Sequence, residues 1–134
     1  DLAVLEAALA GRRTAAAKGD AAFVDADIAL HRGVVAAAHN PVLTALFEEF
    51  VPVLRSGLVT LLELTGLRVH DPNTGADTHH DLVVAVAAGD ADTAAAVLRA
   101  DLEATLGLLR ERTGGAGAAG GAGTAGKTEP TPEA

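Results

Sequence analysis

The sequence predicts an all-α protein, folded as an antiparallel bundle of about five helices. Apolar residues recur with a period near 3.6 along the chain, and no segment shows the sustained alternation that is typical of strands. Alanine, leucine and valine supply most of the 49% hydrophobic fraction, and an alanine-rich composition favours closely packed helices. Glycine and proline signals interrupt the pattern at four places, which positions the turns.

The first two helices are expected over residues 2–18 and 20–39. Gly19 ends the first helix, and Asp20 is a favourable N-terminal cap for the second. The face of the first helix that is expected to turn toward the core holds Leu2, Leu5, Leu9 and Ala16. The corresponding stripe of the second helix holds Phe23, Asp27, Leu30, His31, Val34 and Ala38.

The third helix is expected over residues 41–65 and is apolar on nearly every side. Asn40-Pro41 marks its start, because Asn can take the left-handed position at the end of one helix and Pro suits the first turn of the next. Gly66 ends this helix. Residues 67–77 are rich in turn formers and are expected to form a loop.

Two further helices are expected over residues 78–88 and 91–112, folded as a hairpin about Gly89-Asp90. Residues 1–112 then make one helical domain with one modest core. Residues 113–134 are rich in glycine and alanine and contain no Val, Ile, Leu or Phe. Such a segment cannot bury enough apolar surface to offset the entropy of ordering it, so we expect a disordered tail.

Composition excludes several functional classes. The chain has no cysteine, which rules out a disulfide framework and a thiolate zinc site. Its net charge of −8 makes it a poor partner for nucleic-acid phosphates. No apolar run approaches the roughly 18 residues that a membrane span needs, and the first residues lack the pattern of a signal peptide. We therefore expect a cytoplasmic protein with no membrane partner.

Polar residues on an apolar helix stripe are the informative ones. Asp27 and His31 are four residues apart, so their side chains meet on one face of the second helix. An isolated carboxylate among apolar neighbours is costly and needs a partner. This pair alone also fits an exposed ion pair, which is common at this spacing and stabilises little.

A second pair follows from the expected hairpin. His79 and Asp101 each lie eleven residues from Asp90, so the hairpin would place them opposite each other. Together with Asp27 and His31 they could hold a divalent metal such as zinc, manganese, iron, nickel or cobalt. His79 lying half exposed, without any metal, is the competing interpretation. His80 is the alternative ligand, although its position turns it about 100° away from His79.

Arg55 is a charged residue within the apolar third helix. Its planar guanidinium matches a carboxylate, so it is a candidate for binding an acidic ligand. The simpler interpretation, which we favour slightly, is a surface arginine with a buried stem and an exposed head.

Two segments carry a family resemblance: DADIALHRGVVAAAHNPVLTAL and THHDLVVAVAAGDADTAAAVLRADL. In order and spacing they resemble the FCD ligand-binding domain of FadR-type GntR transcription regulators, over roughly residues 2–112. The resemblance implies that Asp27, His31 and His79 match three metal ligands. Asp101 stands where the family usually has its last histidine, and this departure puts the identity of the metal, and its retention, in doubt.

The same resemblance implies the function. The chain would be the effector-sensing and dimerisation domain of a bacterial regulator, binding a small organic acid through zinc, manganese or nickel and acting as a homodimer. DNA would be contacted only through a winged helix-turn-helix that this sequence does not contain, and the opening helix of the domain is also expected to be missing. We expect no enzymatic activity. The alternatives are a small metal-dependent helical enzyme and a metal-free structural module that dimerises through its third helix.

Overall fold

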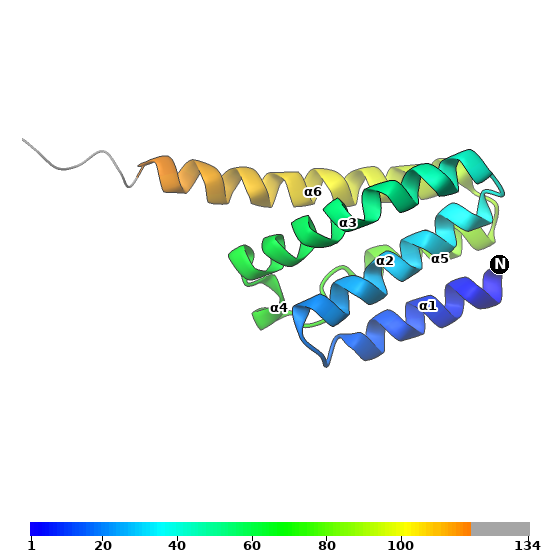
Figure 1. Cartoon of the computed structure of the whole chain (residues 1–134), viewed down its shortest axis with the longest axis horizontal. Coiled ribbons are helices and arrows are strands. Elements are labelled where there is room, and N and C mark those ends of the chain that lie inside the picture. The colour runs from blue at the N-terminus through cyan, green and yellow to red at the C-terminus, as the bar shows by residue number, and fades with distance from the viewer. Residues whose placement is uncertain (119–134) are drawn as a thin grey trace, which may run out of the picture.

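The computed structural model describes residues 1–118, with side chains as far as Glu111. These residues form helices and connecting turns without any strand, which confirms the all-α fold (Figure 1). The helices, in chain order, are α1 (Leu2–Ala15), α2 (Asp20–Ala37), α3 (Pro41–Thr65), α4 (Leu67–His70), α5 (Ala76–Ala87) and α6 (Ala91–Ala118). Within the described range, none of them is both long enough and apolar enough to cross a membrane.

The helices pack in two layers. α1, α2 and α3 lie side by side in chain order, and α5 and α6 pack behind them (Figure 1). α5 contacts both α1 and α6, whereas α6 makes only a small contact with α3. The predicted hairpin of the last two helices is confirmed: Gly89 takes the left-handed conformation with φ 70°, and the Asp90 carboxylate accepts a hydrogen bond from the backbone N–H of Thr93.

The turn before α3 differs in detail from the prediction. His39, and not Asn40, takes the left-handed conformation, with φ 49°. Asn40 is extended, because the residue before a proline is pushed out of helical conformations. Its side-chain oxygen caps α3 by accepting hydrogen bonds from the backbone N–H groups of Val42 and Leu43.

Glycine caps both the end of α3 and the start of α2. Gly66 ends α3 in the left-handed conformation, with φ 62°, as predicted. The prediction of Asp20 as a cap was wrong, because Gly19 is the N-cap of α2 and Asp20 lies inside the helix. The carboxylate of Asp20 is engaged elsewhere, in an ion pair with Arg68.

Other boundaries also moved. α1 ends three residues earlier than expected, and α2 ends two residues earlier. The segment expected to be a loop begins with the short helix α4, and α5 starts two residues earlier than expected, after Gly75 in the left-handed conformation. α6 continues to Ala118, beyond the expected end at Arg112 and into the segment predicted to be a tail. An established helix adds residues more easily than it nucleates, which allows this extension. The rest of the predicted tail, residues 119–134, lies outside the described residues.

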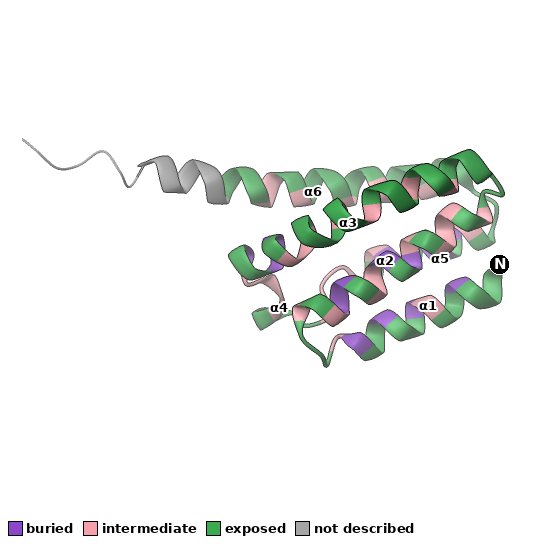
Figure 2. Ribbon diagram, viewed as in Figure 1, coloured by how far each residue is buried: buried purple, intermediate pink, exposed green. Residues whose placement is uncertain are grey.

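The core consists of two apolar clusters. One lies between α1, α2 and α5 and contains Leu5, Leu9, Leu30 and Val83. The other lies between α2 and α3 and contains Phe23, Val24, Ile28 and Leu62. Figure 2 shows this burial on α1, α2 and α5, with α3 and α6 exposed along much of their length. Leu2 and Ala38, which were expected on the core face, are exposed because they lie at the ends of their helices.

Candidate functional site

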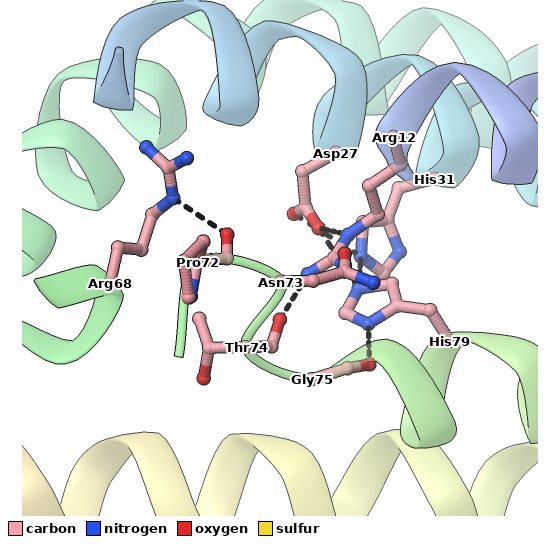
Figure 3. A network of polar contacts seen from close by, with 9 residues as sticks. All are labelled: Arg12, Asp27, His31, Arg68, Pro72, Asn73, Thr74, Gly75 and His79. Carbon is pink, nitrogen blue, oxygen red and sulfur yellow. Dashed lines mark hydrogen bonds and ion pairs between the residues drawn. The ribbon is translucent and has the colours of Figure 1, made fainter. Parts of the chain in front are cut away.

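Three of the four predicted metal ligands come together. Asp27 and His31 project from adjacent turns of α2, and His79 projects from the first turns of α5 (Figure 3). Each offers one ligating atom, and these atoms all lie within 4.8 Å of one another. Nε2 of His79 is 3.0 Å from Oδ1 of Asp27 and 3.3 Å from Nε2 of His31. The fold therefore places one carboxylate and two imidazoles at a single point between α2 and α5.

His79 is oriented by the backbone just before α5. Its Nδ1 is 2.7 Å from the carbonyl oxygen of Gly75, and since a carbonyl can only accept, Nδ1 carries the proton. Nε2 is then the ring atom directed at Asp27 and His31, which is the usual arrangement of a metal-binding histidine. Gly75 has φ 76°, and a Cβ there would lie 3.2 Å from Nδ1, so this position requires glycine.

Arg12 is a site residue that the sequence analysis missed. Its side chain is 3% exposed. Nε donates to Oδ1 of Asp27 at 2.6 Å, and Nη2 donates to the carbonyl oxygen of Thr74 at 2.7 Å (Figure 3). The signal was present, because Leu5, Leu9 and Arg12 follow the spacing of one helix face. A polar residue that continues an apolar stripe is the same signal that marks Asp27.

The surroundings shift the pKa values of both Asp27 and His31. Burial by itself raises the pKa of Asp27, but the hydrogen bond with His79 and the attraction of the two histidines and Arg12 outweigh it. The net effect holds the pKa of Asp27 far below its usual range, so the carboxylate is ionised. Burial lowers the pKa of His31, and the opposing effects of Asp27 and Asp101 do not cancel this. A neutral imidazole beside an ionised carboxylate is the form that binds a metal.

The remaining predicted site residues are arranged differently. Asp101 is partly buried on α6, and its charge acts on His31, but it is outside the group of mutually close ligand atoms found in residues 1–111. His80 is exposed. Arg55 makes a two-point ion pair with Asp25 at 2.6 Å and 3.0 Å, and both side chains are about half exposed. Arg55 therefore occupies the surface position that we favoured from the sequence.

The donor set fits a divalent metal. Two imidazole nitrogens and one carboxylate suit zinc, nickel and manganese. Ligand bonds of about 2.1 Å require donor atoms roughly 3.0 to 3.5 Å apart, and the two distances from Nε2 of His79 fall in this range. Oδ2 of Asp27 lies 3.7 Å from Nε2 of His31, and the hydrogen bond from Arg12 is made to the other oxygen.

An open cavity of about 440 Å³ adjoins this region. It is lined by Asp71, Asn73, Gly75, Ala76, Asp77 and Thr78. Two of these residues also support the site, since Asn73 accepts a hydrogen bond from Arg12 and Gly75 accepts one from His79. None of the three metal donors lines the cavity, and its two aspartates make it unsuited to an anion.

Comparison with known families agrees with the geometry. The family model of the FCD domain matches residues 1–104. No curated protein and no solved structure shows a significant match to the chain. The family match covers α1 to α5 and the first half of α6, and it includes every residue of the site. The chain thus belongs to the FCD domain family, the C-terminal effector-binding domain of GntR-family transcription regulators.

Proposed function

We propose that this domain senses a small organic acid through a divalent metal held by Asp27, His31 and His79. The observation that carries the proposal is the convergence of the three ligating atoms within 4.8 Å, in a place where the carboxylate is ionised and His31 is neutral. When bound, the metal supplies positive charge and open positions for carboxylate oxygens. Zinc, manganese and nickel all suit this donor set.

Asp101 is proposed as the fourth ligand. The charge of Asp101 acts on His31 from α6. A carboxylate in this place makes the donor set harder than one with a third histidine, which shifts the preference from zinc toward manganese. Because Asp101 is partly exposed, its contribution to metal affinity is smaller than that of Asp27.

The segment between α4 and α5 is the proposed element that responds to the acid. Arg12 of α1 holds it through the Thr74 carbonyl, and His79 of α5 holds it through the Gly75 carbonyl. An acid bound between the two side chains would favour one position of this segment over another. Ligands shift such equilibria by their differential affinity for the two states, and a DNA-binding head joined to the domain would respond to that shift.

Dimerisation is proposed to use a stripe on α3, which comprises Val42, Leu46, Phe50, Val53 and Leu64. All five side chains are exposed, and at about 100° per residue they fall within roughly 80° of one another. No charged residue of α3 lies in this sector. Val42 and Leu64 are each eleven residues from Val53, so a second copy packed antiparallel about Val53 would match the stripe with itself.

Elemental analysis of protein purified without chelators or metal-affinity resin tests the metal site. We expect about one divalent ion per chain, and none in the Asp27→Ala/His79→Ala double variant. The matched control is His80→Ala, which removes the exposed neighbouring histidine and should retain the metal. Metal-free parent protein whose thermal stability does not change on adding zinc or manganese would contradict the proposal.

Analytical ultracentrifugation tests the dimer. A charge on the stripe is strongly disfavoured at an apolar interface, so Val53→Glu should convert the dimer to a monomer. Ala45→Glu adds the same charge at an exposed position of α3 whose counterpart about Val53 is the buried Leu61, so it should leave the dimer intact. Equal sedimentation of the two variants would assign the dimer contact to another surface.

A further inference from the structure

Arg12 places a fixed positive charge inside the proposed metal site. Its guanidinium is 3% exposed and donates to the same carboxylate that is the only anionic donor of the group Asp27, His31 and His79. It is also held by the Thr74 carbonyl, by the Asn73 side chain at 3.3 Å, and by stacking on Phe23 at 4.4 Å from the ring centroid. Four contacts fix the cation in place, so it cannot leave without breaking several of them.

The carboxylate is already paired before any metal binds. Asp27 contributes −1 and the fixed guanidinium of Arg12 contributes +1, at 2.6 Å from each other. Every buried side-chain nitrogen and oxygen in the described part of the chain already has a partner. A divalent cation would therefore enter a partly buried cluster whose one carboxylate is already paired, beside an arginine that repels it. Asp101 offsets only part of this charge, because it is partly exposed.

Arg12 also retains capacity for an anion. A guanidinium has five N–H groups, and three are used by Asp27, Asn73 and Thr74. The other two are on Nη1 and Nη2, one on each nitrogen. A small acid can thus accept from Arg12 with one oxygen and meet the metal with the other, which removes the repulsion between the two cations.

We infer that Arg12 makes metal binding at this site depend on a bound carboxylate, so that the metal and the acid are captured together. The inference rests on the proposed function and adds its regulation. Without an acid, Arg12 pairs with Asp27 and lowers the affinity of the site for the metal. With an acid bound, this affinity rises. By thermodynamic linkage the metal must raise the affinity for the acid by the same factor. The domain would then report the acid and the metal jointly.

Isothermal titration of the full chain with manganese, with and without millimolar acetate, tests this coupling. Acetate is a suitable probe because it supplies one carboxylate and nothing else. In the parent we expect acetate to tighten manganese binding about tenfold or more, since charges a few ångströms apart interact strongly even in a partly polar medium. Equal manganese affinity with and without acetate would overturn the inference.

Variants separate the charge of Arg12 from its bulk. Arg12→Met keeps the length and removes the charge, so it should bind manganese about tenfold more tightly than the parent without acetate and should no longer respond to acetate. Arg12→Lys keeps the charge but has no N–H group left for an acid, so it should bind manganese as weakly as the parent and respond less to acetate. Arg13→Met is the matched control, because it removes an equal charge from the exposed neighbouring position and should change neither affinity nor response.

Stability measurements provide a second test if Arg12→Met folds poorly. Without metal, this variant should unfold at a lower temperature than the parent, because Asp27 loses its cation. Manganese should raise its melting temperature by more than it raises that of the parent. Equal manganese affinity in the parent and in Arg12→Met would overturn this inference but would leave the proposed metal function standing. Failure of manganese, zinc and nickel to bind even Arg12→Met would overturn the proposed metal function with it.

Discussion

Arg12 and Arg68 are two buried arginines with nearly the same surroundings and different roles. Both stack on Phe23, at 4.4 Å and 4.3 Å from the ring centroid. Each pairs with an aspartate of α2, and each donates to a backbone carbonyl of the segment between α4 and α5. Figure 3 shows them on either side of this segment, with Arg12 beside the histidines.

Their partners distinguish them. Arg68 donates to Asp20 and to the carbonyl groups of Ala16, Lys18 and Pro72. None of these four acceptors belongs to the candidate metal ligands. It therefore ties the α1–α2 turn to the end of α4. Arg12 binds a carboxylate that it shares with His79. Burial and hydrogen bonding alone therefore do not mark a functional arginine. Sharing a carboxylate with a candidate metal ligand does.

The largest expected effect separates the two aspartates. Asp27→Ala should lower the free energy of unfolding by about 3 to 5 kcal/mol, because Arg12 is left buried without its counter-charge. Asp20→Ala should cost clearly less, because the Asp20 side chain is 34% exposed and water can replace it. Urea unfolding in the presence of EDTA measures both. An equal or greater loss for Asp20→Ala would contradict the conclusion that Arg12 depends more strongly on its aspartate than Arg68 does.

The next effect concerns the two arginines themselves. Arg68→Met should lower the free energy of unfolding by about 2 to 3 kcal/mol, because it leaves one carboxylate and three carbonyls without their donor. Added zinc or manganese should not restore this loss, whereas it should restore much of the loss in Arg12→Met. Thermal melts of both variants with and without metal provide the measurement. Metal rescue of Arg68→Met would assign both arginines to one site.

A smaller effect is expected from pH in metal-free protein. Burial lowers the pKa of His31 below its unfolded value of about 6.5, so the unfolded chain takes up a proton first as the pH falls. The stability that neutral His31 contributes is present above about pH 6.5 and is lost as the pH falls below it, by at most about 1.4 kcal/mol per pH unit. The pKa of Asp27 is depressed far below this window, so Asp27 does not contribute there.

Urea unfolding between pH 7.5 and 5.5 measures the slope, with two variants for comparison. His31→Gln should flatten the curve, because it removes the group that titrates. His39→Gln, which replaces an exposed histidine beyond the end of α2, is the matched control. A parent curve that is flat through this range, or that rises toward acid, would contradict the direction of the His31 shift.

The smallest effect is expected on the surface. Arg55→Ala breaks the exposed ion pair with Asp25 and should change the free energy of unfolding by less than about 1 kcal/mol. It should also leave acetate-dependent manganese binding unchanged, because Arg55 is bonded outside the site. A loss of acid response in this variant would restore Arg55 as the carboxylate-binding residue and weaken the case for Arg12.

Local signals in the sequence were enough to predict most of the fold. The helical period and the stops at Gly66 and Gly89-Asp90 are short-range features, and each acts in the structure as expected. The i to i+4 spacing of Asp27 and His31 predicted their shared face for the same reason. Where predictions failed, two local preferences competed. Asn40 suits both a helix end and a helix start, and the proline that follows it decided in favour of the start.

Most of the helices and turns, and the shared face of Asp27 and His31, follow from local patterns, because backbone preferences and side-chain spacing operate within a few residues. The packing of the helices brings His79 to this pair from 48 residues away and leaves Asp101 outside the group of close ligand atoms found in residues 1–111. It alone placed the cation of Arg12 against Asp27 rather than in solvent. Such choices depend on how whole helices pack, since angstrom-scale differences in packing decide which charged groups touch.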